Sequence, residues 1–167
     1  MGDSLSVIFA TIVAAIIMFL FPMLDTWERQ DDLSYIAAYT SVVNTVDSVR
    51  NTGRLTADMY NNLITSLNAT GNRFDVQLEH RAAEYVNAGA NKYEVVYLNH
   101  YTQDIENALN TSGEYVDFRK GDYFYISVKN RNKTQATVLK QNLYGIKMET
   151  FKIGVPYGGQ IRNEYVR

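Results

Sequence analysis

Side chains that could carry out chemistry are few in this chain of 167 residues, and they are scattered along it. Its two histidines, His80 and His100, lie far apart, and neither has neighbours at the spacing of a metal site. His80 falls on the same side of an alternating segment as apolar residues, which predicts a histidine at the edge of the core with a hydrogen-bond partner. We expect His100, in a predicted loop, to face solvent. The absence of cysteine excludes disulfides, thiolate metal sites and thiol catalysis.

A cluster of charged side chains lies at a predicted hairpin turn. Asp117, Lys120 and Asp122 could bind calcium or a substrate there, although turns are ordinarily rich in such residues. The sequence shows no zinc-protease motif, phosphate-binding glycine loop, nucleophile elbow or EF-hand pattern. We therefore expect a protein that is not an enzyme, with no catalytic residue, metal ligand or cofactor. Three sequons match the pattern for N-glycosylation, and in a chain rich in Asn and Thr they can also arise by chance: Asn68, Asn110 and Asn132.

Charge and length narrow the choice of partners and domains. The net charge is −2 and the basic residues are dispersed, so we expect no nucleic-acid partner, which would need a basic face. The length allows one membrane segment and a single compact domain of about 140 residues. Thirteen tyrosines suit a polar outer surface or a subunit interface, because tyrosine combines contact area with a polar tip.

The first 26 residues predict a membrane helix that stays attached to the protein. Residues 4–24 carry no charge, and at about 1.5 Å per residue they cross the roughly 30 Å hydrocarbon layer of a bilayer. A cleaved signal peptide would instead have Lys or Arg before the apolar run and a small-x-small site after it. A buried helix of a soluble protein is the third alternative. The exit flank is acidic on balance, so we place the N-terminus in the cytoplasm and the remainder outside.

The same helix is predicted to continue beyond the membrane, over residues 27–53. No Gly or Pro interrupts the chain from Trp27 to Gly53, where glycine provides a helix stop. The predicted helix is about 48 residues long, on the order of 70 Å. Pro22 should bend it, and the alternative is two helices broken at this proline. An apolar stripe at three- and four-residue steps makes the second half amphipathic: Ile36, Tyr39, Val42, Val43, Val46 and Val49.

Residues 54–167 predict an α/β head, which gives the whole chain an α+β fold. A short helix follows the N-cap Thr56 and packs on the first helix as a helical hairpin. Alternation then predicts an antiparallel sheet with strands at 73–81, 92–98, 114–119, 122–129 and 149–155, the third and fourth forming a hairpin. Residues 84–90 are predicted as a loop, 102–109 and 134–144 as helices, and the segment after Pro156 as a loop.

The membrane half also carries residues suited to helix packing. Small side chains at Ala10, Ala14 and Ala15 allow close approach of neighbouring helices. Asp3 is either a helix-start residue or, in a bundle with an axial offset, a partner for the N-terminal amine of a neighbouring subunit. The side chains expected to be buried between subunits in place of lipid are Val7, Phe9, Val13, Ile16 and Phe19.

A charge-free N-terminal segment with Asp3 near its start and Pro22 near its end, an amphipathic continuation and an α/β head together resemble type IV pilins and pseudopilins. More loosely, the pattern is similar to the pilin-like proteins encoded with Tad-type pilus machinery in Gram-positive bacteria. The resemblance implies that Asp3 stands near the acidic residue that aids subunit docking and that Pro22 matches the helix-bending proline. The sequence departs from the family pattern at the basic leader, the Gly-Phe processing junction and the C-terminal cysteine pair, none of which it shows.

The sequence therefore predicts a structural subunit of an extracellular filament or of an envelope-spanning assembly. Its partners would be copies of itself or related pilin-like subunits, and membrane lipid before assembly. It would be a single-pass protein of the cell membrane, and part of a cell-surface filament once assembled. The alternative is a solitary membrane-anchored binding or adhesion domain, and a weaker third hypothesis is an anchored enzyme with an unrecognised site.

Overall fold

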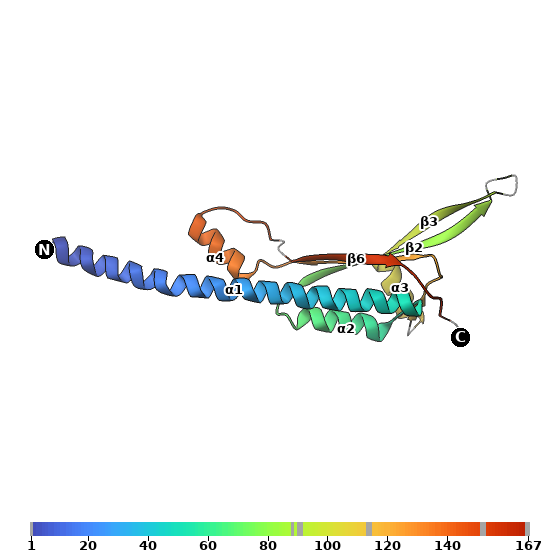
Figure 1. Ribbon diagram of the computed structural model, residues 1–167, viewed down its shortest axis with the longest axis horizontal. Helices are drawn as coiled ribbons and strands as arrows, with labels where there is room; N and C mark the ends of the chain where they lie inside the picture. The colour runs from blue at the N-terminus through green and yellow to red at the C-terminus, as the bar shows by residue number, and fades with distance from the viewer. Residues whose placement is uncertain (1, 88, 90–91, 113–114, 151–152, 166–167) are drawn as a thin grey trace.

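One helix, α1 (Gly2–Thr52), runs the length of the molecule. The computed structural model describes residues 2–87, 89, 92–112, 115–150 and 153–165. With 51 residues at about 1.5 Å each, α1 is roughly 76 Å long. It passes through Pro22 without a break, as a continuous and gently curved rod (Figure 1). The prediction of one helix is confirmed, and the alternative of two helices broken at Pro22 is wrong.

The C-terminal half of α1 forms the spine of the head. Its fully buried side chains recur at three- and four-residue steps: Ala38, Val42, Val46 and Val49. Two residues assigned to this stripe from the sequence, Ile36 and Tyr39, face outward and are 56% and 45% exposed. The helix ends at Gly53, whose φ of +70° is in the left-handed region. A Cβ there would lie 2.4 Å from the carbonyl oxygen of Asn163, so glycine fits both the turn and the close approach.

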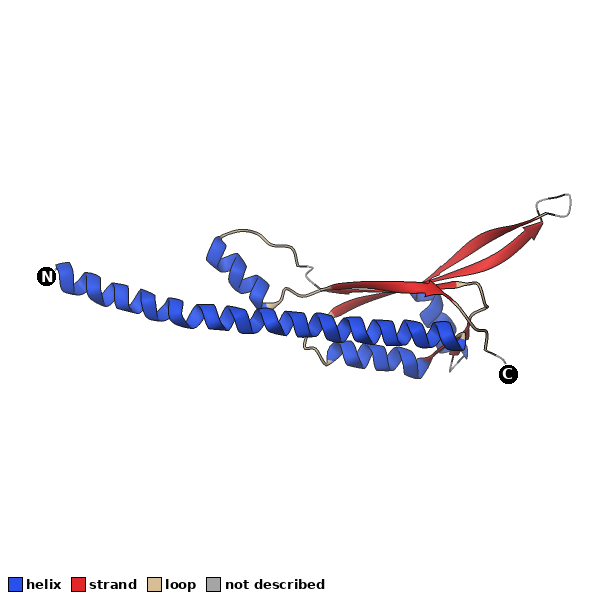
Figure 2. Ribbon diagram, viewed as in Figure 1, coloured by secondary structure: helices blue, strands red, loops and turns tan. Residues whose placement is uncertain are grey.

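Three shorter helices surround this spine. The second helix, α2 (Ala57–Asn68), lies beside α1 as the predicted hairpin and buries Leu63 and Leu67, with Thr56 accepting a hydrogen bond from the Met59 amide at 3.2 Å. Ile105 and Leu109 of α3 (Thr102–Ser112) face the core, as predicted. The fourth helix, α4 (Gln135–Tyr144), lies over the middle of α1, apart from the sheet (Figures 1 and 2).

An antiparallel sheet of four strands packs on α1 in the order β3-β2-β5-β6. Its strands are β2 (Phe74–Asn87), β3 (Tyr93–Tyr101), β5 (Tyr123–Asn130) and β6 (Gly154–Gln160). Phe124, Ile126 and Val128 of the inner strand β5 are buried, as their alternation predicts. Two short strands, β1 (Arg54–Thr56) and β4 (Tyr115–Asp117), form a separate antiparallel pair. The α+β class with a long N-terminal helix and an antiparallel sheet is confirmed.

Three strand predictions are wrong, each because pairing between distant segments decides the structure. The predicted loop at 84–90 is strand up to Asn87, because its residues pair with β3, Tyr85 opposite Val95. The predicted hairpin of 114–119 with 122–129 does not form, because β4 pairs with β1. The last strand covers residues 154–160 and not 149–155, and Phe151 lies outside the described residues.

Most of the last strand, β6, from Pro156 onward, was predicted as loop because of its proline and glycines. It lies at the sheet edge, where Pro156 need not donate a ladder hydrogen bond. Gly158 sits opposite Tyr125, and a Cβ on it would meet the tyrosine ring at 2.1 Å. A Cβ on Gly159 would likewise lie 2.8 Å from the guanidinium carbon of Arg50. The glycines therefore permit close packing against neighbouring groups, which a turn-based interpretation does not anticipate.

Candidate functional site

The two histidines and Asp122 form a structural cluster at the base of the β2–β3 hairpin. His80 Nε2 lies 2.9 Å from Asp122 Oδ2, which confirms the predicted hydrogen-bond partner. His100 is in β3 directly opposite His80, and the rings stack at 5.5 Å, so the prediction of a solvated loop histidine is wrong. Burial lowers the pKa of His80 below its ordinary value, although Asp122 acts in the opposite direction.

The carboxylate of Asp122 holds the turn rather than a ligand. Its side chain is 3% exposed and accepts hydrogen bonds from the amides of Ala83 at 2.9 Å and Arg119 at 3.0 Å. Asp117 points elsewhere, to the guanidinium of Arg54 at 2.6 Å. The structure therefore separates the three residues of the predicted calcium or substrate cluster. Among the residues that the structure describes, no group of three or more His, Cys, Asp or Glu could hold a metal.

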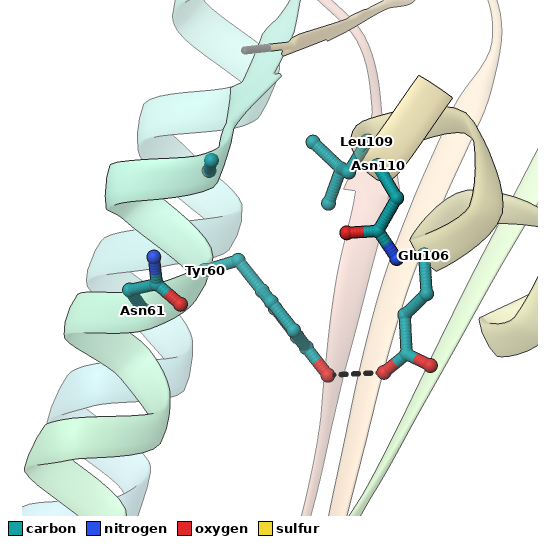
Figure 3. Close-up of a pocket in the computed structure, with 6 residues that line it drawn as sticks. Tyr60, Asn61, Glu106, Leu109 and Asn110 are labelled. Atoms are coloured by element: carbon teal, nitrogen blue, oxygen red, sulfur yellow. Dashed lines mark hydrogen bonds between the residues drawn. The ribbon is translucent and has the colours of Figure 1, made fainter. Parts of the chain in front are cut away.

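A pocket of about 310 Å³ lies between α2 and α3 (Figure 3). Tyr60 Oη donates to Glu106 Oε1 at 2.6 Å across it, and Asn61, Leu109 and Asn110 complete much of its lining. Burial, and then the hydrogen bond to Glu106, raise the pKa of Tyr60 well above its ordinary value. A protonated phenol paired with a carboxylate offers no activated nucleophile, so this contact joins two helices.

The three sequon asparagines differ in accessibility. Asn68 and Asn110 are exposed at helix surfaces. Asn132 is half-buried, and its amide group donates to Asn72 Oδ1 at 3.0 Å and accepts from the Arg73 amide at 2.7 Å. A glycan on Asn132 would disturb this connection between the segment that precedes β2 and the segment that follows β5.

The N-terminal part of α1 presents an apolar surface on all sides. Its most apolar window has a mean hydropathy of 2.7, and none of that window is buried within the chain. By length and composition this helix can cross a membrane, a property that retained anchors and signal sequences share. The predicted packing residues are all exposed: Val7, Phe9, Val13, Ile16, Phe19 and Pro22. Asp3 lies where no side chain is described, and its docking role stays a prediction.

A second apolar face lies further along α1, after the exposed charged residues Asp25, Arg29 and Asp32. Leu33, Ile36 and Tyr39 are exposed there, and Tyr35 stacks on Tyr39 at 6.3 Å. At about 100° per residue, this face lies roughly 120° around the helix axis from the buried stripe that contacts the head. The distal half of α1 thus has one apolar face covered by its own chain and another that is open.

The sequence-based interpretation missed a third exposed surface, the outer part of the β2–β3 hairpin. This arm, residues 82–87 and 93–98, extends away from the body of the molecule (Figures 1 and 2). Large apolar and aromatic side chains on it are exposed: Tyr85, Val86, Tyr93, Val95, Val96, Tyr97 and Leu98. The signal was present in the run at 93–98, but the predicted loop at 84–90 concealed its pairing partner.

These three surfaces are the candidate site. Their common property is apolar area open to the surroundings, which in soluble proteins marks contacts with other macromolecules or with membranes. No family model, curated protein or solved structure matches this chain. The functional interpretation therefore depends on the geometry of the chain itself.

Proposed function

We propose that this protein is a structural subunit of an extracellular filament or an envelope-spanning assembly, like the type IV pilins and pseudopilins that its N-terminal pattern resembles. The subunit would wait in the membrane with residues 4–24 in lipid and its head outside the cell. Assembly would bring the α1 helices of several copies side by side, so that residues such as Val7, Phe9 and Ile16 exchange lipid for protein contacts. No step of this mechanism requires catalysis or a cofactor.

The observation that carries this proposal is the open apolar face at Leu33, Ile36 and Tyr39. A helix that only tethers a domain needs apolar side chains as far as the membrane boundary, near Leu24. The open face begins nine residues later, about 13 Å further along the helix. Lateral packing of identical helices requires an apolar face that the head of the same chain does not cover. The face at Leu33, Ile36 and Tyr39 meets this requirement, because the head packs on a different face of α1.

The energetics favour this face as the driving surface. Inside a bilayer, helix association gains little from the hydrophobic effect, because lipid tails are as apolar as the side chains. The face outside the bilayer is in water, and covering the exposed part of a residue such as Ile36 contributes about 1 kcal/mol. Several such contacts per subunit, repeated along a polymer, would outweigh the loss of freedom on association. The membrane segment would then align the helices, and burial of the face outside the bilayer would supply most of the favourable free energy of association.

Cysteine crosslinking tests the proposal directly, since the chain has no cysteine of its own. The variant Ile36→Cys places a thiol on the open face, and Ser66→Cys places one on the exposed side of α2 as a matched control. In native membranes or sheared surface material, oxidation of Ile36→Cys should give disulfide-linked dimers far in excess of the control. Native gels of unoxidised material should show long polymers. Monomers alone in native membranes would refute the proposal.

The arm favours a second candidate function, that of a membrane-anchored binding or adhesion domain. A two-stranded hairpin with apolar side chains exposed to water is marginally stable without a cover, so a partner on it would stabilise the arm. Replacing Tyr85 and Tyr93 by Ser distinguishes the two functions. Loss of surface adhesion with intact polymers would assign recognition to the arm, and loss of polymers would make the arm part of the subunit interface.

A further inference from the structure

Helix α4 is fixed to α1 at its beginning and runs toward the N-terminal, apolar part of that helix. Thr134 Oγ1, at the N-cap of α4, donates to Asp31 Oδ2 at 2.8 Å, and both side chains are buried. Nearly two helical turns further along α4, Lys140 forms an ion pair with Glu28. These two contacts fix where α4 lies along α1, which Figure 1 shows over the middle of the rod.

The far end of α4 then reaches the membrane segment itself. Leu143 and Tyr144 line an apolar groove of about 260 Å³ together with four residues of α1: Ile17, Leu20, Phe21 and Leu24. Ile17 lies about 10 Å before the end of the charge-free segment at Leu24, and Asp31 lies about 10 Å beyond that end. Figure 1 shows α4 inclined to α1, with its far end displaced toward the N-terminal part of that helix. The end of α4 therefore lies level with the last turns of the charge-free segment.

The side chains at this end are suited to a membrane boundary. Leu143, Tyr144 and Ile146 are exposed, Tyr144 at 64%, and the groove beside them has an apolar lining. Tyrosine is enriched where hydrocarbon meets the headgroups, because its ring is apolar and its hydroxyl polar. Lys147 follows directly and can extend its amine toward lipid phosphates while its stem stays in the apolar layer.

We propose that residues 143–146 are a second membrane contact, which inserts at the head-side boundary of the bilayer so that lipid acyl chains fill the groove between α4 and α1. The inference rests on the membrane-inserted stage of the proposed function. It commits to lipid as the occupant, because the groove lies at the level of a segment that itself needs lipid. The contact would hold the head at two points and so restrict its tilt relative to the membrane.

Fluorescent labels on single cysteines test this contact in the full-length protein. The protein is reconstituted at low density in vesicles of phosphatidylcholine and phosphatidylglycerol that carry a nitroxide on a shallow acyl-chain position, and in a parallel set with the nitroxide on a deep position, which reports on the label at position 12. Labels are placed by Tyr144→Cys and Ile146→Cys, and by Ile12→Cys in the predicted span. Gln135→Cys is the matched control, exposed at the start of the same helix near Asp31. The Ile146 site follows the helix end and is exposed, so its label leaves the core intact.

The expected result is quenching by nitroxide lipid that is severalfold stronger at positions 144 and 146 than at position 135. Quenching at 12, with 144 and 146 no more quenched than 135, would overturn this inference and leave the proposed function standing. An unquenched label at 12 would refute the membrane stage, and both ideas with it. A third outcome is that the labels at 144 and 146 are shielded from water but not quenched by nitroxide lipid, and only at protein densities where Ile36→Cys crosslinks. This outcome would assign the groove to a second copy of the protein and overturn the lipid contact.

Discussion

The two apolar faces of α1 predict opposite consequences for alanine substitutions only ten positions apart. Val46 is fully buried against the head. Val46→Ala removes two methyl groups, at about 0.8 kcal/mol each for the lost burial, and leaves a small cavity in a packed core. We expect the free energy of unfolding of the head to fall by about 2 kcal/mol. Assembly should be affected only to the extent that the head is less stable.

Ile36→Ala should weaken association between subunits and leave the stability of the head nearly unchanged. The side chain is 56% exposed, and alanine is the better helix former, so the free energy of unfolding should change by no more than about 0.5 kcal/mol. Removing most of the exposed apolar area should cost about 1 kcal/mol for each subunit contact that covers it. This corresponds to association that is weaker by roughly fivefold to tenfold.

The free energy of unfolding of both variants is measured by urea unfolding in the same detergent, followed by tyrosine fluorescence and circular dichroism. The strength of association is measured by the crosslinking yield at a fixed position outside the changed face, as a function of protein density in vesicles. Equal losses of stability in both variants would mean that the two faces are not distinct. Unchanged assembly in Ile36→Ala would show that the open face is not the subunit interface, and the proposed mechanism would fail.

Three further predictions concern the head. Burial places the pKa of His80 below its ordinary 6.5, so the unfolded chain binds more protons than the folded chain as the pH falls through 6.5. The free energy of unfolding should therefore decrease between about pH 7.5 and about pH 5.5. The urea midpoint of His80→Gln should depend less on pH than that of the unchanged protein. Thr134→Val removes a helix cap and a donor to buried Asp31, and should lower the urea-derived free energy of unfolding by about 1–3 kcal/mol. Gly158→Ala forces a methyl group to within 2.1 Å of the Tyr125 ring, so the melting temperature should drop by several degrees, and an unchanged value would contradict the packing at this edge.

Local signals in the sequence account for the parts of the fold that were predicted correctly. Thr56 caps α2 as expected, α4 begins next to its predicted start at residue 134, and Gly53 ends α1 in the left-handed conformation. Each of these signals depends on a few neighbouring residues, so it can be interpreted without the remainder of the chain. The length of α1 was predictable for the same reason, because no residue after Pro22 interrupts it before Gly53.

The features that were missed depend on pairing between distant segments. His80 and His100 stack only because the register of β2 and β3 places them opposite each other. The arm exists because Tyr85 and Val86 continue that register past the point where the composition predicts a loop. Similarly, β4 joins β1, about 60 positions away in the chain. No local pattern contains such information.

The periodicity of apolar residues in α1 predicts which side chains form a stripe, but not which of them the head covers. Three- and four-residue spacing joins Ile36, Tyr39, Val42 and Val46 into one stripe along the sequence, so the sequence predicts one broad apolar face, although at about 100° per residue Ile36 lies about 120° around the axis from Val42. The head is too narrow to cover all of it, and its sheet and α2 enclose only the part centred on Val42. With residues 4–24 in a bilayer, as proposed, the uncovered part would lie in water, where exposed apolar area is unfavourable. A chain selected only to anchor a head would gain stability from polar side chains there, so the persistence of this face is the strongest physical argument for a neighbouring subunit.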